Sequence, residues 1–302
     1  DEVREVVAYA AERYIEVIPE VDLPGHMLAA MTAYPELGCT RGPYEVATHW
    51  GVFDDVLCPG RENTFDFIEG VFTEIMELFP SEYVHIGGDE CPKVRWKACP
   101  DCQKRIRQLG LKGDGEHSAE EKLQSYTISR VEKFLNDNGR RVIGWDEILE
   151  GGVAPNATVM SWRGTAGGIK ATQLGHDVIM TPNIFLYFDY PQGEPGNPQE
   201  PFIGHRPKVT VGTVYGYEPY ADELTGEQRA HIKGVQANMW TEYLPAPENV
   251  EYMLMPRIDA LSEVQWVSEG RKDYDAFLVR LRRMAALYDK FGYNYARHAF
   301  VE

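Results

Sequence analysis

The alternation of strand-like apolar segments with amphipathic helical segments constrains the fold of this 302-residue chain more than any other feature. Val3, Val6, Val7 and Ala10 recur at helical spacing, and residues 15–22 follow as a buried strand that ends in an acid. The same patterns predict further helices at 63–79, 120–139, 167–175 and 274–292, and further strands at 82–90, 140–147, 157–164, 177–190 and 234–242. Strands that alternate with helices predict a parallel sheet.

Each predicted strand ends in a polar or aromatic residue: Asp22, Glu90, Glu147, Trp162, Asp189 and Glu242. A parallel sheet that closes into a barrel collects these ends on one face, where barrel active sites lie. The chain has no G-x-G-x-x-G motif of the kind that often marks an open doubly wound sheet. We therefore predict one α/β domain over residues 1–302, a TIM-type (β/α) barrel of about six strands, with a long Pro/Gly-rich loop insertion at 191–220.

Composition excludes several classes of function. With 43% hydrophobic residues the chain can build a core, but it contains no apolar run long enough to cross a membrane. Its net charge of −17 gives no basic stripe for a phosphate backbone, so no nucleic-acid partner is expected. No signal peptide is visible, and the first residue is not Met, so a mature or excised fragment is expected.

The five cysteines allow three interpretations. Cys99 and Cys102 form a C-x-x-C pair, and Cys39, Cys58 and Cys91 precede it as single residues. A structural zinc site needs four ligands, and a second paired motif is not present. Free thiols, one disulfide and a metal site stay open, with free thiols favoured over the other two.

Six motifs stand in order along the chain: PEVDLPGH at 19–26, HIGGDE at 85–90, GWDE at 144–147, SWRG at 161–164, YFDY at 187–190 and GVQANMWTE at 234–242. Together they resemble the family 20 glycoside hydrolases, the β-N-acetylhexosaminidases, from residue 1 to about 290. The resemblance implies a (β/α)8 barrel that lacks its first two strands here, together with the Arg that holds the sugar hydroxyls in relatives. It also favours a periplasmic, extracellular or lysosomal-type compartment.

The adjacent acids Asp89 and Glu90 suit a particular chemistry. Ordinary retaining glycosidases place two carboxyl groups on opposite sides of the sugar, which is awkward for sequence neighbours with Cα atoms about 3.8 Å apart. The pair makes sense if a 2-acetamido group of the substrate attacks C1 itself. The resemblance implies that Glu90 is the acid/base, that Asp89 orients the acetamido group, and that Tyr187 donates a hydrogen bond to the acetamido oxygen.

The resemblance also implies the remaining site residues. Trp145, Trp162 and Trp240 would wall the sugar pocket, and Asp189 and Glu242 would accept hydrogen bonds from sugar hydroxyls. In a strand, Asp189 and Tyr187 would point to the same side. The supporting residues would be Asp22, His26 and His85. No cofactor and no metal are expected at this site.

The predicted activity is exo-hydrolysis of β-linked N-acetylhexosamine from a glycan or amino-sugar oligosaccharide. Two alternatives are kept. One is a carbohydrate-binding remnant with impaired turnover. The other is a metal-dependent barrel enzyme with Asp22, His26 and Glu90 as ligands, although no H-E-x-x-H or similar spacing supports it. Because an incomplete barrel leaves two sheet edges open, the chain is also expected to form homo-oligomers or to aggregate, with weak activity.

Overall fold

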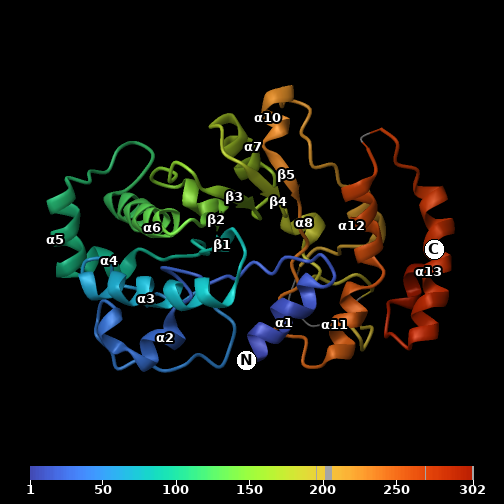
Figure 1. The fold of residues 1–302 in the computed structure, drawn as a ribbon, viewed down its shortest axis with the longest axis horizontal. Coiled ribbons are helices and arrows are strands. Elements are labelled where there is room, and N and C mark those ends of the chain that lie inside the picture. Colours follow the sequence, from blue (N-terminus) through green and yellow to red (C-terminus); the bar gives the residue numbers. More distant parts are fainter. Residues whose placement is uncertain (195, 201–205, 269, 301–302) are drawn as a thin grey trace. The chain divides into compact units, whose positions relative to one another are not determined.

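The computed structural model describes residues 1–194, 196–200, 206–268 and 270–300, with helices and strands alternating along most of the chain (Figure 1). The chain divides into two compact units, residues 1–160 and 161–302. The paired strands within the described residues are parallel, and neighbours in the sheet are consecutive in the chain. The prediction of a parallel sheet built from alternating strands and helices is therefore confirmed.

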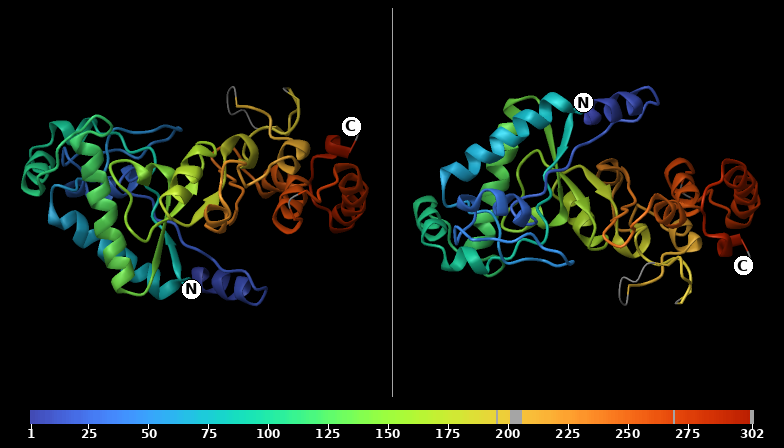
Figure 2. Two further views of the ribbon diagram at one scale, coloured as in Figure 1. Left: turned by 90° about the horizontal axis from the view of Figure 1, so that it is seen from above. Right: turned by 90° about the horizontal axis from the view of Figure 1, so that it is seen from below.

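The first unit is built around β1 (Tyr83–His85), β2 (Arg141–Trp145) and β3 (Thr158–Ser161). Val84 lies opposite Val142, and Gly144 lies opposite Val159. Helices α3 (Glu62–Leu78) and α6 (Ala119–Asp137) pack on each other, and α6 packs on β2 (Figure 2). The start of α6 is fixed by a capping box, in which Ser118 and Glu121 satisfy each other's backbone N–H groups.

The predicted strand at residues 15–22 is reduced to a single bridge, in which Glu20 pairs with His85 of β1. The Val21 N–H donates to the His85 carbonyl at 3.0 Å, and the His85 N–H donates to the Pro19 carbonyl at 2.9 Å. Pro19 has no N–H to extend this ladder. The segment is thus extended and attached to β1, and it carries Asp22 to the end of that strand.

The second unit contains β4 (Val178–Met180) and β5 (Ile232–Val235), which pair in parallel with an irregularity between Val178 and Ile179. The prediction of a strand at residues 185–190 is wrong. Asn183–Leu186 forms the one-turn helix α8, and Tyr187 makes a single bridge to Asn238. Because Tyr187 ends a helix rather than lying within a strand, strand geometry does not set the relative directions of Tyr187 and Asp189.

Part of the predicted 191–220 loop is helical, since α9 spans Val211–Tyr215. Residues 195 and 201–205 of that loop lie outside the described residues. The division into one domain over residues 1–302 stays a prediction.

The other helices of the second unit are α7 (Ala166–Gln173), α10 (Gly226–Ala230), α11 (Pro247–Leu254), α12 (Arg257–Trp266), α13 (Tyr274–Phe291) and the 3-10 helix η3 (Arg297–Phe300). The predicted helices at 167–175 and 274–292 are confirmed. The left-handed Gly292, with φ of +74°, ends α13 as expected.

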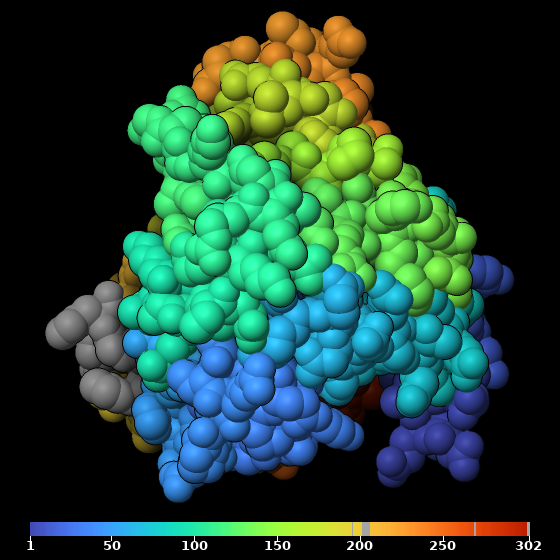
Figure 3. Space-filling model, turned by 90° about the vertical axis from the view of Figure 1, so that its left-hand side faces the viewer, coloured from blue at the N-terminus to red at the C-terminus, as the bar shows by residue number. Residues whose placement is uncertain are grey.

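The first unit also contains α1 (Glu2–Ala11), α2 (Leu28–Ala33), η1 (Pro35–Leu37), α4 (Val94–Ala98), α5 (Pro100–Leu109) and η2 (Asp146–Leu149). The predicted helix at the start of the chain is confirmed as α1, although Ala10 is its one buried residue. On the face shown in Figure 3, the blue segment around α2 lies beside the cyan and green residues of α3 to α6. Among the described residues, no helix is long and apolar enough to cross a membrane.

Candidate active site

The turn that follows β1 places two carboxylates in a strained backbone. After His85 the chain passes through Gly87 (φ +68°) and Gly88 (φ +97°), and Glu90 itself has φ of +44°. A Cβ atom on Gly87 would lie 1.6 Å from Oδ1 of Asp22, so glycine is required there on steric grounds as well. A left-handed glutamate is uncommon and costs free energy, and such strain concentrates at functional sites.

The imidazole of His26 lies among three carboxylates. Its Nε2 atom is 3.4 Å from Glu90 Oε2, 3.5 Å from Asp89 Oδ2 and 3.9 Å from Asp22 Oδ2. His26 also has a left-handed backbone, with φ of +53°. The residue before it, Gly25, passes so close to this turn that a Cβ atom would lie 2.9 Å from the Asp89 carbonyl oxygen.

This arrangement determines the charges of the cluster. Hydrogen bonds to Asp89 and then to Glu90 raise the pKa of His26 to about 10, so its ring is an imidazolium at neutral pH. Burial, followed by the negative charge of Asp89, raises the pKa of Asp22 to about 9. Asp22 is therefore protonated, and it accepts the Gly88 N–H at 3.1 Å through Oδ1. One cation thus faces Asp89 and Glu90, with a neutral acid beside them.

Asp89 and Glu90 present their carboxylates toward the same nitrogen atom. Asp89 Oδ2 lies 3.5 Å from His26 Nε2, and Glu90 Oε2 lies 3.4 Å from the same atom. The separation of these two oxygens therefore cannot exceed the sum of the two distances. Oδ1 of Asp89 is buried and has no hydrogen-bond partner among the described residues. Buried polar atoms are normally paired, so this oxygen is available to accept a hydrogen bond from a ligand. The Glu90 side chain is 32% exposed and accessible to a substrate.

Trp145 is held at the end of β2 by a residue that the motifs did not single out. Its Nε1–H donates to Glu20 Oε1 at 3.0 Å, and its ring lies 4.7 Å from that of His85. Glu20 Oε1 is also 3.2 Å from His85 Nδ1, which lies 3.0 Å from the Gly87 N–H. His85 is buried, and Glu20 Oε1 contacts both His85 and Trp145. The position of Glu20 two residues before the strand-end acid Asp22 is the signal that could have identified it.

In the second unit, Tyr187 is the centre of an aromatic group. Its ring stacks on Trp162 with centroids 6.1 Å apart and an interplanar angle of 17°, and it meets the edges of Tyr190 and Trp240. Tyr187 is buried, and burial raises the pKa of its hydroxyl, so the phenol stays a hydrogen-bond donor. Trp240 is 39% exposed, which leaves part of its ring accessible.

Asp189 carries the second polar group of this unit. Burial, followed by the negative charge of Glu242, raises the pKa of Asp189 to about 7. Its Oδ1 atom is buried and has no hydrogen-bond partner among the described residues. Glu242 is exposed. Both acids can accept hydrogen bonds from hydroxyl groups. Asp189 would gain more from such a bond, because its Oδ1 atom is buried and has no partner among the described residues.

Arg257 holds the segment that carries Tyr187 and Asp189. Its side chain is fully buried, and it donates hydrogen bonds to the carbonyl groups of Phe188, Tyr190, Val209 and Met253. Burial lowers the pKa of Arg257 to about 9. No local sequence signal marks Arg257, because its partners lie up to 69 positions away in the chain.

A divalent metal ion has one possible set of ligands near the paired acids. Donor atoms of Asp22, His26 and Asp89 lie within 4.8 Å of one another, whereas Glu90 does not belong to this group. A metal-bound histidine must be neutral, and the raised pKa of His26 favours the imidazolium instead. A cavity of about 270 Å³ occurs in the second unit, but none of the predicted site residues lines it.

Comparison with known proteins identifies the class. The catalytic domain model of glycosyl hydrolase family 20 matches residues 1–269. The chain belongs to this family, and its parallel strands and helices form part of the TIM barrel of these catalytic domains. The family membership and fold class expected from the six motifs are confirmed.

Several relatives are similar over most of this chain. The β-hexosaminidase of Porphyromonas gingivalis is 47% identical to this chain, over 98% of this chain and 37% of its own length. The β-hexosaminidase of Vibrio furnissii is 34% identical, over 87% of this chain and 42% of its own length. The crystal structure of an inactive mutant of the exo-β-N-acetylglucosaminidase from Vibrio harveyi superposes with a TM-score of 0.85, at 31% identity, covering 98% of this chain and 46% of that chain. The chain thus spans less than half the length of these relatives.

Proposed function

We propose that this chain carries the catalytic machinery of a β-N-acetylhexosaminidase. It would remove terminal, non-reducing, β-linked N-acetylhexosamine residues from glycans, with retention of configuration. The observation that carries the proposal is the placement of Asp89 and Glu90 around one imidazolium, with an unpaired buried oxygen on Asp89. The Vibrio harveyi relative has been solved in complex with N-acetylglucosamine, which supports an amino-sugar substrate.

The geometry favours a nucleophile that belongs to the substrate. An inverting enzyme needs carboxyl groups about 6.5–9.5 Å apart on opposite faces of the sugar, and an ordinary retaining enzyme needs an opposed pair about 5–5.5 Å apart. Asp89 and Glu90 are sequence neighbours and both lie near His26 Nε2, which supports an approach to the sugar from one side. The acetamido oxygen of the sugar would then attack C1 from the other side and form a cyclic oxazolinium ion.

Each acid has a distinct role in this mechanism. Glu90 gives its proton to the glycosidic oxygen as the bond to C1 breaks, and it later takes a proton from the water that opens the oxazolinium ion. Asp89 accepts the acetamido N–H through Oδ1 and stabilises the positive charge that develops on that group. His26 and Asp22 position the two acids, because the His26 ring contacts both carboxyl groups and Asp22 fixes the Gly88 turn.

The remaining roles fall to residues 161–302. Tyr187 would donate its hydroxyl to the acetamido oxygen, which its raised pKa permits. Asp189 and Glu242 would accept hydrogen bonds from sugar hydroxyls, and Trp162 and Trp240 would contact the apolar face of the sugar, as Trp145 would in the first unit. The comparisons give no support to the alternative of an impaired carbohydrate-binding remnant. Homo-oligomer formation through open sheet edges stays a prediction.

Leaving-group dependence in Glu90→Gln tests this proposal. Acid catalysis matters in proportion to the pKa of the leaving group, so hydrolysis of a disaccharide should fall about 10²–10⁴-fold. A nitrophenyl N-acetylglucosaminide, whose leaving group needs little protonation, should lose much less. Equal losses on both substrates would remove Glu90 from the role of acid.

An inhibitor distinguishes the nucleophile. A thiazoline analogue of the oxazolinium ion should inhibit far more strongly than N-acetylglucosamine, because analogues of the transition state bind about 10²–10⁸-fold more tightly than substrates. Weak inhibition by the thiazoline would rule out substrate assistance. Assays with and without a chelator, run on the same preparation, address the metal-dependent alternative separately.

A further inference from the structure

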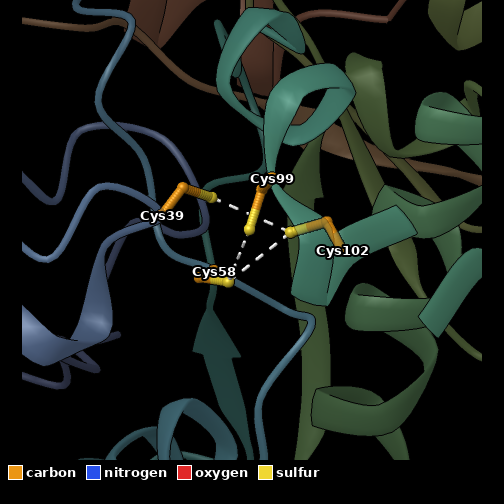
Figure 4. A group of neighbouring side chains, drawn as sticks. All are labelled: Cys39, Cys58, Cys99 and Cys102. Atoms are coloured by element: carbon orange, nitrogen blue, oxygen red, sulfur yellow. Dashed lines mark hydrogen bonds between the residues drawn. The ribbon is translucent and has the colours of Figure 1, made fainter. Parts of the chain in front are cut away.

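Four of the five cysteines, Cys39, Cys58, Cys99 and Cys102, meet in the first unit (Figure 4). Their sulfur atoms all lie within 4.8 Å of one another. The Cys39–Cys102, Cys58–Cys99 and Cys58–Cys102 separations are 3.8, 3.7 and 3.5 Å. Cys58, Cys99 and Cys102 are buried, and Cys39 is partly buried. We call these four residues the cysteine cluster.

The distances match a particular coordination geometry. In a tetrahedral zinc site with Zn–S bonds of about 2.3 Å, neighbouring sulfur atoms are about 3.8 Å apart. A disulfide instead requires two sulfurs at about 2.05 Å. Since Cys58 is nearly equidistant from two other sulfurs, at 3.7 and 3.5 Å, the cluster is arranged around a common centre rather than in bonded pairs.

The backbone around the cysteine cluster is built to hold these positions. The Cys58 N–H donates to the Leu37 carbonyl at 2.8 Å, and Gly38 bridges Leu57, so Cys39 and Cys58 come from two adjoining segments. The Gly60 N–H donates to the Cys58 sulfur. A Cβ atom on Gly60 would lie 2.4 Å from the Cys102 backbone nitrogen, so this turn packs directly on the C-x-x-C turn.

Helix α5 and Arg61 also hold the cysteine cluster in place. Cys99 is the N-cap of α5, and Cys102 lies in the first turn of that helix. The guanidinium of Arg61 interacts electrostatically with Cys58 and Cys99. Arg61 also donates to the carbonyls of Glu36 and Gly38 at 2.6 Å, and to Asp101 at 3.0 Å. It thus connects the segment before Cys39, its own segment after Cys58 and the C-x-x-C turn.

We propose that Cys39, Cys58, Cys99 and Cys102 bind one structural zinc ion as a closed tetrathiolate site. Sulfur ligands in a tetrahedral set select zinc or iron, and a site with four protein ligands leaves no position for a substrate. On binding, each thiol loses its proton to solvent and each sulfur forms one bond to the metal, so no oxidant or reductant is required.

The site would stabilise the loop that carries His26. The Leu57 N–H donates to the Pro24 carbonyl at 3.0 Å, and the Leu57 carbonyl accepts the Trp96 Nε1–H at 2.8 Å. Cys58 follows Leu57 directly, and Trp96 is fully buried in the same core as the cysteines and Leu123 of α6. A zinc ion at the cysteine cluster would therefore fix the segment on which the turn from Asp22 to His26 rests.

Metal analysis of the purified protein tests the proposal. The wild type, from cells grown with zinc and purified without chelator, should contain about one zinc per chain. Cys39→Ser and Cys102→Ser should each lose at least half of that zinc. Cys91→Ser is the matched control, because Cys91 is buried in the same core but lies outside the cysteine cluster, and it should keep the full amount. These measurements are independent of glycosidase activity.

A second measurement covers the case in which the serine variants do not fold. Titration of the wild type with a mercurial thiol reagent should release zinc to a chromogenic chelator in step with thiol modification. The metal-free protein should then unfold at a temperature lower by about 5 °C or more. Reduced protein without zinc, disulfides among these cysteines in peptide mapping, or iron in place of zinc would each overturn the assignment.

Discussion

The two compact units hold their functional groups in different ways. In residues 1–160 the acids stand on a left-handed turn, and an imidazolium opposes their charge. In residues 161–302 the polar groups stand on an irregular segment that a buried arginine fixes through carbonyl groups. The first unit therefore concentrates backbone strain and charge, whereas the second depends on one desolvated cation and on aromatic packing.

This difference corresponds to the chemistry proposed for each unit. A general acid and a charge-stabilising carboxylate require tuned protonation, which neighbouring charges provide. The Tyr187 phenol and the Asp189 carboxyl group must instead be held in fixed positions, and hydrogen bonds from Arg257 to the backbone hold them. Changes to the first unit should consequently alter pH dependence and turnover, and changes to the support of the second should alter stability first.

The largest expected effect is on the stability of the second unit. In Arg257→Met, the carbonyls of Phe188, Tyr190 and Val209 lose their buried donor. An unsatisfied buried group costs about 1–3 kcal/mol, so the free energy of unfolding should fall by about 4 kcal/mol or more. Urea unfolding measures the change, and hydrogen exchange should place it in residues 161–302.

Arg280→Met is the matched control for that variant. Arg280 forms a bidentate pair with Glu263 at 2.5–2.8 Å, but its side chain is 50% exposed. Its loss should cost little, because solvent screens an exposed ion pair. If the two substitutions cost the same, the buried arginine would not be what supports the segment.

A steric test addresses the strained turn of the first unit. Gly87→Ala would bring a Cβ atom to 1.6 Å from Asp22 Oδ1 in addition to imposing a left-handed alanine. Gly110→Ala has nearly the same φ, +65°, with nothing within 4 Å of the added atom, and so measures the backbone penalty alone, about 1–2 kcal/mol. Gly87→Ala should cost clearly more in thermal unfolding and should also reduce kcat. Equal costs would show that contact with Asp22 is unimportant.

The charge cluster predicts how stability depends on pH. The pKa of His26 is raised in the folded protein, so its stabilising contribution is fully present below about pH 6.5 and is lost as pH rises toward 10. Asp22 also has a raised pKa, so the folded state retains a proton that the unfolded state releases above about pH 4. Both shifts make stability fall from neutral pH to pH 9.

Urea unfolding at a series of pH values measures this slope. His26→Gln should be less stable at neutral pH, and its stability should depend less steeply on pH between 7 and 9. Asp22→Asn should likewise remove part of the slope. A wild-type stability that is flat over this range would contradict the assignment of an imidazolium at His26.

Sequence reasoning reached those features that short segments determine. Helical periodicity located α3, α6 and α13. It failed where a distant contact decides the structure. The apolar residues 185–190 read as a strand, but Asn183–Leu186 forms a helical turn and Tyr187 pairs at a single position with Asn238. Short apolar segments do not distinguish helix from strand by period.

The supporting residues could not be predicted for a related reason. Glu20 accepts a hydrogen bond from Trp145, which lies 125 positions later in the chain. Cys39 contacts Cys102, which lies 63 positions later. Cys99 and Cys102 stand at the spacing of a metal-binding pair, but Cys39 and Cys58 are single residues whose proximity arises from the bridge between Gly38 and Leu57. Residue type and spacing suggest the chemistry, whereas long-range packing selects the partners.

The smallest expected effect concerns the link between Glu20 and Trp145, in which a neutral N–H of the first unit donates to a carboxylate. Glu20→Gln keeps an acceptor for the Trp145 Nε1–H, and Glu20→Leu removes it. A hydrogen bond from a neutral donor to a carboxylate is worth about 1.5–3 kcal/mol, but the Glu20 side chain is 35% exposed, so about 1 kcal/mol is expected for Glu20→Leu and less for Glu20→Gln. If Trp145 contacts the sugar, Glu20→Leu should raise KM with little change in kcat, because it loosens a binding wall and leaves Asp89 and Glu90 in place. Steady-state kinetics on the nitrophenyl substrate separates the two constants, and a loss confined to kcat would mean that Glu20 acts on the paired acids through His85 rather than on the tryptophan.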